Sequence, residues 1–294
     1  MANVGSVSSA RRLVVHAGDV GMSHGANVAV LELSRLGSIT SGSVMVPCPW
    51  FAEIASAAAA DPALDLGVHL TLCSEQRGYK WRPVGHATAA SGLIDDDGYL
   101  WPDVASVRRH AYPEAVEAEW RAQIDRALAA GIDVTHLDAH MGAALGPEFC
   151  NRYVRVGADY HLPVLITSVL SRHAPQVPHL ADVSDAAFAP YAAYAAKVGM
   201  PLFDQVVVTD FTRPSDRPAD YRAVLGGIEG DLAFCAFHPA APGDIQVIEP
   251  SACHVRIDEY ELFRTDEWCE WLSGQGFALI GMRTLRDEYR AAHT

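Results

Sequence analysis

The amino-acid sequence predicts a single α/β domain with a barrel-like arrangement of strands and helices. Apolar runs with strand character alternate with helical patterns from residue 11 to the end of the chain. No segment has the composition of an interdomain linker, and we find no internal repeat. The chain has 294 residues, half of them hydrophobic, enough for one large core or two modest ones. A doubly wound α/β sheet is the alternative architecture for such an alternation.

The first quarter of the chain shows this alternation clearly. The predicted elements are a strand at 11–17, a helix between Ser23 and Gly37, a strand at 39–46, a helix at 50–60 and a strand at 64–72. Ser23 is a candidate N-cap of the first helix, and Gly37 lies just past its end. The second helix ends at Asp61-Pro62, because the residue before a proline disfavours the helical conformation.

Periodicity is lost between residues 73 and 112. This stretch is rich in Gly and Pro, and it carries Tyr79, Trp81 and Trp101. A long loop without secondary structure inside a compact domain is usually functional, so we predict a lid or substrate loop here. The acidic run 95–97 within it is most simply a solvated turn.

The alternation resumes at Pro113 and continues to the carboxyl end. The predicted elements are a helix at 113–130, a strand at 132–140, a helix at 147–160, a strand at 162–166, a peripheral helical region at 170–200, strands at 203–208 and 231–237, a helix at 260–273, a strand at 277–282 and a helix at 284–289.

Composition excludes several classes of protein. The formal charge of −14, without a basic run, argues against binding to nucleic acid or to an anionic membrane surface. The six cysteines form no CxxC pair, which is typical of reduced thiols in a cytoplasmic protein. We recognise neither a signal peptide nor an apolar run long enough to span a bilayer, and we expect residues 1–10 to be a frayed tail.

Three apolar runs end on residues that can bind a metal. These residues are Asp19 in LVVHAGDVG, His69 in LGVHLTL, and His136, Asp138 and His140 in IDVTHLDAH. Because side chains alternate along a strand, the last three share one face and lie at its carboxyl end, where barrel enzymes build active sites. We therefore predict one divalent metal held by an Asp-His-His set that leaves positions open for water and substrate. Taken singly, each histidine is more simply a buried side chain bonded to backbone carbonyls.

For several other residues, the sequence leaves two interpretations open. Asp138 is a candidate for orienting a histidine ligand, and His136 is more plausibly an outer or structural residue than a ligand. His238, at the end of the strand CAFHP, is either a general acid for a leaving amine or a core histidine. Trp50, Tyr79 and Trp81 either stack on a sugar ring or form an apolar cluster under the long loop, and the same two interpretations apply to Trp101.

Five segments together resemble the signature blocks of the YdjC-like (ChbG/HpnK) carbohydrate deacetylases. In order, they are HAGDVGMSHGAN, SITSGSVMVPCPWF, GVHLTL, GIDVTHLDAHM and FHP, and RIDEYELF continues the likeness. The resemblance implies a distorted, TIM-like (β/α) barrel, a divalent metal and removal of an N-acetyl group from an amino sugar. It implies Asp19, His69 and His140 as metal ligands and His238 as the proton donor to the amine.

The sequence departs from the family pattern at Gly18. The first block of the family usually reads NADDFG, and its first Asp, the expected general base, falls on Gly18. Glycine cannot accept a proton, and loss of a positioned base costs roughly 10²–10⁴-fold in rate. Asp138 or His16 could act as the base instead, the chain could be an inactivated variant, or it could bind its ligand without turnover. A second departure is Gly142, where the family often has another histidine.

These observations lead to one expected function and two alternatives. We expect a metal-dependent N-deacetylase that acts on an amino sugar or a chitooligosaccharide-like substrate in the cytoplasm. Zinc suits the ligand set best, and magnesium, nickel or cobalt are alternatives. A silent sugar-binding homologue and an amidohydrolase for a non-sugar amide are the competing functions. We expect a small-molecule partner, no nucleic acid and no membrane, and leave a homodimer open.

Overall fold

The computed structural model describes residues 11–173 and 180–293, so the predicted tail at 1–10 lies outside the described residues. Its centre is a parallel sheet with the strand order β4-β3-β2-β1-β6-β5, and a short β7 pairs with β1. The strands are β1 (Arg12–Val20), β2 (Ser41–Val44), β3 (Leu66–Leu70), β4 (Val134–Ala139), β5 (Gln205–Val208), β6 (Leu232–Phe237) and β7 (Ala278–Leu279). All the pairings are parallel, as the predicted β/α alternation requires.

An irregular segment between β4 and β5 completes a distorted TIM-like barrel. Val164 bridges to Leu137 of β4, and His173 bridges to Val206 of β5. The regular strand predicted at 162–166 is therefore wrong, because only isolated bridges form. Pro163 has no N–H to donate to a ladder, and the backbone bonds reduce to a few such as Leu165 N to Leu137 O at 2.8 Å. The barrel is thus least regular between β4 and β5.

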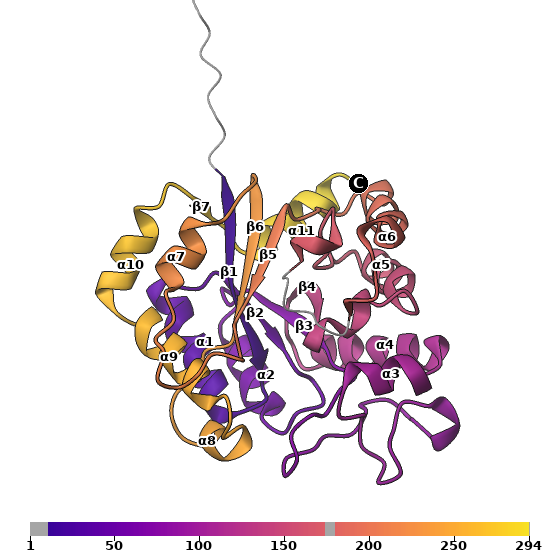
Figure 1. The fold of residues 1–294 in the computed structure, drawn as a ribbon. Helices are drawn as coiled ribbons and strands as arrows, with labels where there is room; N and C mark the ends of the chain where they lie inside the picture. The colour runs from indigo at the N-terminus through magenta and orange to yellow at the C-terminus, as the bar shows by residue number, and fades with distance from the viewer. Residues whose placement is uncertain (1–10, 174–179, 294) are drawn as a thin grey trace, which may run out of the picture.

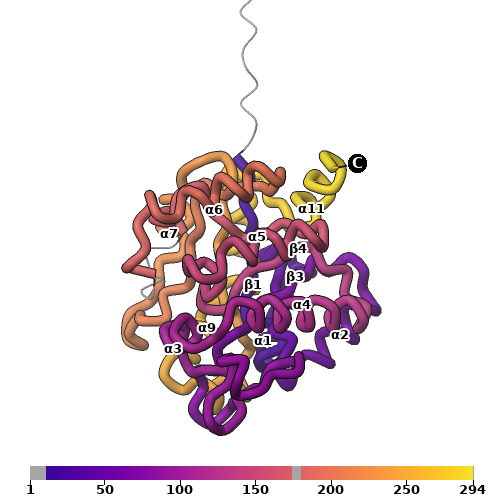
Figure 2. Tube along the Cα trace, turned by 90° about the vertical axis from the view of Figure 1, so that its right-hand side faces the viewer, coloured from indigo at the N-terminus to yellow at the C-terminus, as the bar shows by residue number. Residues whose placement is uncertain are grey.

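Helices cover the outside of the barrel. They are α1 (His24–Leu36), α2 (Phe51–Ala60), α3 (Val104–His110), α4 (Pro113–Ala129), α5 (Cys150–Asp159), α6 (Asp185–Lys197), α7 (Tyr221–Gly226), α8 (Ile245–Ile248), α9 (Cys253–Phe263), α10 (Asp266–Ser273) and α11 (Met282–Ala291), with 3₁₀ turns η1 (Ala89–Ser91), η2 (His140–Leu145) and η3 (Leu170–Arg172). In Figure 1, α4, α5 and α6 lie to the right of the sheet and α7, α9 and α10 to the left. Figure 2 shows the layer formed by α4 and α5 from the side.

Several element boundaries differ from the sequence predictions. The stretch 73–112 is not wholly irregular, because it contains α3, whose seven residues are too short to show a helical period. The helix predicted at 260–273 is two helices, because the Thr265 side chain caps α10 by accepting from Trp268 N. The predicted caps of α1 are confirmed: Ser23 accepts from Ala26 N, and Gly37 adopts a left-handed φ of 74°.

The first strand runs past its predicted end and carries an irregularity there. β1 continues to Val20, and its register with β2 shifts between Ala17 and Val20. Asp19 has a φ of 57°, a left-handed conformation that aspartate adopts more readily than most residues. This local turn reorients the Asp19 side chain relative to the regular alternation of the strand. As a result, its carboxylate faces the ends of β3 and β4.

The inward-facing side chains are polar on some strands of the barrel and apolar on others. At one level, neighbouring strands place Ser41, His16, Ala236 and Val208 in register. His16 and Ser41 are hydrogen-bonded to each other, whereas Ala236 and Val208 pack against an apolar cluster that contains Leu165, Val206 and Phe234. The interior therefore has a polar half on β1–β4 and an apolar half on β5, β6 and the irregular segment.

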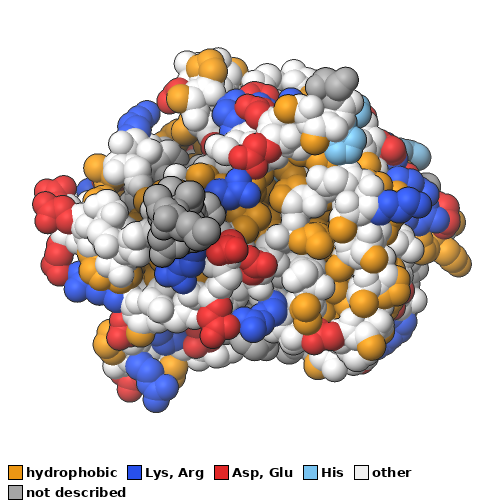
Figure 3. All heavy atoms as spheres, turned by 90° about the horizontal axis from the view of Figure 1, so that it is seen from above, with side chains coloured by type: hydrophobic (Ala, Val, Ile, Leu, Met, Phe, Trp, Pro, Cys, Tyr) orange, Lys and Arg blue, Asp and Glu red, His pale blue; other side chains and the backbone are white. Residues whose placement is uncertain are grey.

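The surface carries charges of both signs. On the face shown in Figure 3, basic side chains (blue) and acidic side chains (red) are interspersed. In the described residues, no helix is both long and apolar enough to cross a membrane.

Candidate metal centre

Asp19, His69 and His140 converge at the carboxyl ends of β1, β3 and β4. One ligand-type atom from each lies within 4.8 Å of the others, and all three residues are buried. Asp19 Oδ1 is 3.3 Å from His69 Nε2 and 3.0 Å from His140 Nδ1. Ligand atoms about 2.0 Å from a tetrahedral zinc ion would be separated by similar distances. The three side chains therefore fit a single divalent cation.

Each of these three side chains is oriented by a partner of opposite charge character. His69 Nδ1 is 2.7 Å from Asp138 Oδ1, and His140 Nε2 is 3.1 Å from Glu75 Oε2. The second carboxylate oxygen of Asp19 accepts from Arg256 Nη2 at 2.8 Å. Metal-binding histidines commonly donate their other ring nitrogen to a carboxylate, which fixes the tautomer and the ring orientation.

The charges around the group favour its ionised forms. Burial acts to raise the pKa of Asp19, but Arg256 and His140 hold that pKa well below its usual value. Burial acts to lower the pKa of both histidines, but Asp138 raises that of His69 to about 9 and Glu75 raises that of His140 to about 10. Because a ligand imidazole must be neutral, cation binding here would release protons.

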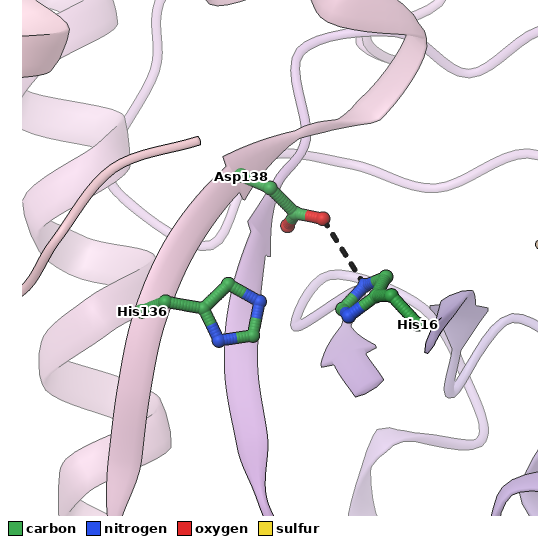
Figure 4. Close-up of side chains that lie close together, drawn as sticks. All are labelled: His16, His136 and Asp138. Carbon is green, nitrogen blue, oxygen red and sulfur yellow. Dashed lines mark ion pairs between the residues drawn. The ribbon is translucent and has the colours of Figure 1, made fainter. Parts of the chain in front are cut away.

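Asp138 also belongs to a second buried group, with His16 and His136 (Figure 4). Asp138 Oδ2 accepts from Ser43 Oγ at 2.9 Å and lies 3.3 Å from His16 Nε2. In Figure 4 the His136 ring points toward the space between Asp138 and His16. Asp138 thus joins the three-residue centre to a polar layer beneath it, the outer position that the sequence predicted for this carboxylate.

Gly18 lies against the ring of His238. A Cβ atom built on Gly18 would be 2.8 Å from both Cδ2 and Nε2 of His238. Real Cβ atoms essentially never approach other atoms so closely, so a side chain at position 18 would displace the imidazole. The space that a side chain at position 18 would enter is therefore occupied by the ring of His238, which directly follows β6.

A short relay holds His238 in place. Thr209 Oγ1 is 2.7 Å from Glu259 Oε1 and 2.9 Å from His238 Nδ1. If Thr209 donates to the Glu259 carboxylate, its oxygen accepts from His238 Nδ1–H, which leaves Nε2 with a free lone pair beside Gly18. Burial lowers the pKa of His238 to about 3, so the ring is neutral at physiological pH. The predicted role as a proton donor then requires that His238 first accept a proton.

Comparison with known proteins decides the family. The model of the YdjC-like proteins matches residues 12–274. The chain belongs to the YdjC-like family. It is 37% identical over 160 residues to a carbohydrate deacetylase of Thermus thermophilus, a match covering 54% of this chain and 55% of that protein. It is 23% identical to a carbohydrate deacetylase of Thermoanaerobacter pseudethanolicus over 87% of this chain and 91% of that protein.

A solved structure supports the YdjC-like fold. A protein of Enterococcus faecalis V583, described as a cellobiose-phosphate cleavage protein, superposes with a TM-score of 0.75. The two share 22% sequence identity, and the match covers 94% of this chain and 99% of that one. This likeness confirms the distorted barrel predicted from the resemblance.

A cavity of about 560 Å³ opens beside the candidate metal centre of this YdjC-like chain. Asp19, His69, His140 and His238 all line it. The predicted stacking residues Trp50, Tyr79 and Trp81 are not among the described lining residues. Trp81 is buried, with its ring 6.3 Å from that of His140, and the Tyr79 hydroxyl donates to Met22 O. In this conformation, these aromatics support the wall behind His140.

Sequence reasoning missed four polar residues of the site. Glu75, Thr209, Arg256 and Glu259 contact the candidate metal ligands or His238. Arg256 and Glu259 lie in RIDEYELF, a block noted for its resemblance, and this was the available signal. Glu75 follows the GVHLTL strand within the irregular stretch, where no pattern distinguishes it from a solvated acid.

Proposed function

We propose that this YdjC-like chain is a metal-dependent hydrolase that removes an N-acetyl group from an amino sugar. The observation that carries the proposal is the convergence of Asp19, His69 and His140, each oriented by its own charged partner. The relatives named carbohydrate deacetylase support the sugar substrate. A divalent cation held by these residues would polarise the amide carbonyl and lower the pKa of a bound water.

His238 would carry both proton transfers. Its free Nε2 lone pair would accept a proton as water attacks the amide carbon, and Thr209 and Glu259 would hold the ring in the required tautomer. The protonated ring would then donate to the nitrogen of the departing amine, which yields acetate and a free amino sugar. On this proposal Gly18 makes room for His238, and the chain is an active enzyme.

The test is release of acetate from N-acetylglucosamine oligomers by the purified chain with added zinc. We expect release that stops when a chelator removes the cation and returns when zinc is restored. Magnesium, nickel and cobalt are compared in the same assay. Tight binding of the oligomers without release of acetate, with every metal, would favour a silent sugar-binding protein. Release from acetylated amines that lack a sugar, and not from the oligomers, would favour a non-sugar amidohydrolase.

A further inference from the structure

The cavity beside the metal centre has one apolar wall. Leu165, Val206, Val208 and Ala236 of this wall come from the irregular segment, β5 and β6, and the cavity is also lined by Ala139, Met141, Leu145 and Phe211. Val208 is in register with Ala236 on the neighbouring strand, so both point to the same face and form one level of this wall. Leu165 and Val206 belong to the buried apolar cluster beneath it.

Two other residues of this wall offer few polar atoms to a ligand. The hydroxyl of Tyr153 donates to Leu137 O at 2.9 Å and accepts from Leu165 N at 3.1 Å, so its polar atom is already used. His173 also lines the cavity; burial lowers its pKa to about 4, which keeps the ring neutral, and its Nδ1 has no hydrogen-bond partner among the described residues. Apart from this nitrogen, a sugar ring placed here would lose the hydration of its hydroxyl groups without replacement hydrogen bonds.

The polar residues lie at the metal centre and at the mouth. Asp210 and Thr212 line the cavity and are exposed. Glu249 and Arg256 also line the cavity, and Arg256 donates to the carboxylates of both Glu249 and Asp19. A substrate amide at Asp19 therefore has two directions available, one toward the polar mouth and one toward the apolar wall.

We infer that the site accepts N-acyl chains longer than acetyl and prefers them, with the chain lying against Leu165, Val206, Val208 and Ala236 while the amine-bearing part faces the mouth. This inference rests on the proposed hydrolysis at the same site and specifies its substrate class. The cavity of about 560 Å³ is within the range of roughly 300–1,000 Å³ that holds drug-sized ligands, and it exceeds the needs of a methyl group.

The reaction balances as an ordinary amide hydrolysis. Water adds to the acyl carbon, the carbon–nitrogen bond breaks, and the nitrogen takes a proton. The products are a short-chain carboxylate and a free amine. The longer chain changes only what fills the cavity, so the same residues act in the same roles.

The experiment compares N-acetyl-, N-butanoyl- and N-hexanoyl-glucosamine through their common product, glucosamine, with zinc added. We expect kcat/KM to rise about 4-fold per methylene, equivalent to ~0.8 kcal/mol for each buried group. A second series keeps the acetyl group and lengthens an alkylamine. If acetyl is preferred in the first series, or only the second series gains, the inference is overturned.

A pair of variants locates the effect. Ala236→Leu adds bulk to the apolar wall and should reduce hydrolysis of the hexanoyl substrate at least 10-fold more than that of the acetyl substrate. Ala223→Leu makes the same change on the exposed surface of α7 and should alter neither ratio nor rate. An equal loss for both substrates in Ala236→Leu would count against the inference.

Calorimetry separates this inference from the proposed function. Hexanoate should bind the unmodified protein more tightly than acetate does, and Ala236→Leu should remove the difference. If no amide is hydrolysed but this binding pattern appears, the acyl cavity stands and the hydrolase proposal fails. If acetate binds as tightly as hexanoate, the acyl cavity is refuted even where deacetylation is observed.

Discussion

The two halves of the barrel interior differ in the side chains that they bury: one half buries hydrogen-bonded polar groups, and the other buries apolar groups beside a cavity. On β1 and β2, His16 places its two ring nitrogens 2.8 Å from Ser41 Oγ and 2.9 Å from Ser43 Oγ, so these buried atoms are paired, whereas Nε2 of the neighbouring His136 has no partner among the described residues. On β5 and β6, the corresponding level is Val208 and Ala236, which leave a cavity. The polar half is suited to hold charged ligands in fixed positions, and the apolar half to admit a flexible group.

The comparison shows that one strand, β1, contributes residues to both halves. β1 lies between the halves, and it carries both Asp19, which faces the polar half, and Gly18, which faces His238 of the apolar side. A buried polar network must be complete to be stable, so its side chains tolerate little change. An apolar wall tolerates changes of size more readily. The predictions below test this division.

The largest effect is expected from removing a metal-binding side chain of the polar half. His69→Ala should abolish cation binding and reduce the rate by more than the roughly 10–100-fold typical of losing an outer partner. Metal content and acetate release measure the two effects. His24→Ala, an exposed histidine paired with Glu53, is the control and should retain both properties. Full metal content in His69→Ala would refute the ligand assignment.

The next effect concerns the boundary between the halves. Gly18→Ala and Gly18→Asp should both displace the His238 ring and lower the rate roughly 10²–10⁴-fold, the contribution of a general base. Gly78→Ala, where nothing lies within 4 Å of the added atom, is the control and should keep the parent rate. If Gly18→Asp is faster than the parent, a missing carboxylate and not His238 is the base.

A smaller effect should follow from changing an outer carboxylate. Glu75→Gln leaves the shape of the side chain but removes the charge that faces His140 Nε2. We expect zinc affinity to fall roughly 10–100-fold, with saturating zinc restoring most of the rate. Titration with a competing chelator measures the affinity. Glu229→Gln, at an exposed ion pair with Arg172, should leave the affinity unchanged.

The smallest effect is a change in pH dependence on the apolar side. Burial raises the pKa of Glu259 to about 7, so the carboxylate is ionised above this pH and protonated below it. Both Glu259 oxygens accept hydrogen bonds, from Thr209 and from His238 N, and protonation converts one of them into a donor, so the rate should fall as the pH drops through about 7. Thr209→Val should be roughly 10-fold slower and should lose this inflection. An unchanged inflection in Thr209→Val would assign it to another group.

The parts of the molecule set by local sequence were predictable. Apolar alternation and the caps Ser23 and Gly37 placed most strands and helices. The polar ends of three strands indicated Asp19, His69 and the set His136, Asp138 and His140, and the family resemblance selected His140 from that set. Such features depend on neighbours in the chain. The catalytic roles of these residues stay predictions until they are measured.

The parts that depend on tertiary contacts were not predictable. Residues 162–166 have a strand-like composition, but Pro163 and the gap beside β4 leave only isolated bridges. The contact between Gly18 and His238 joins positions more than 200 residues apart, so a missing base and a displaced base look the same in sequence. For the same reason, Arg256 could be noticed as part of a block but not assigned to Asp19.

Arg256 and Glu259 lie one turn apart on α9 and reach two different parts of the site. Arg256 holds the Asp19 carboxylate, while Glu259 accepts from the His238 backbone N–H and from Thr209. One helix therefore contacts both the candidate metal ligand Asp19 and the His238 segment. A substitution beneath α9 that changes the orientation of this helix should therefore alter metal affinity and turnover together.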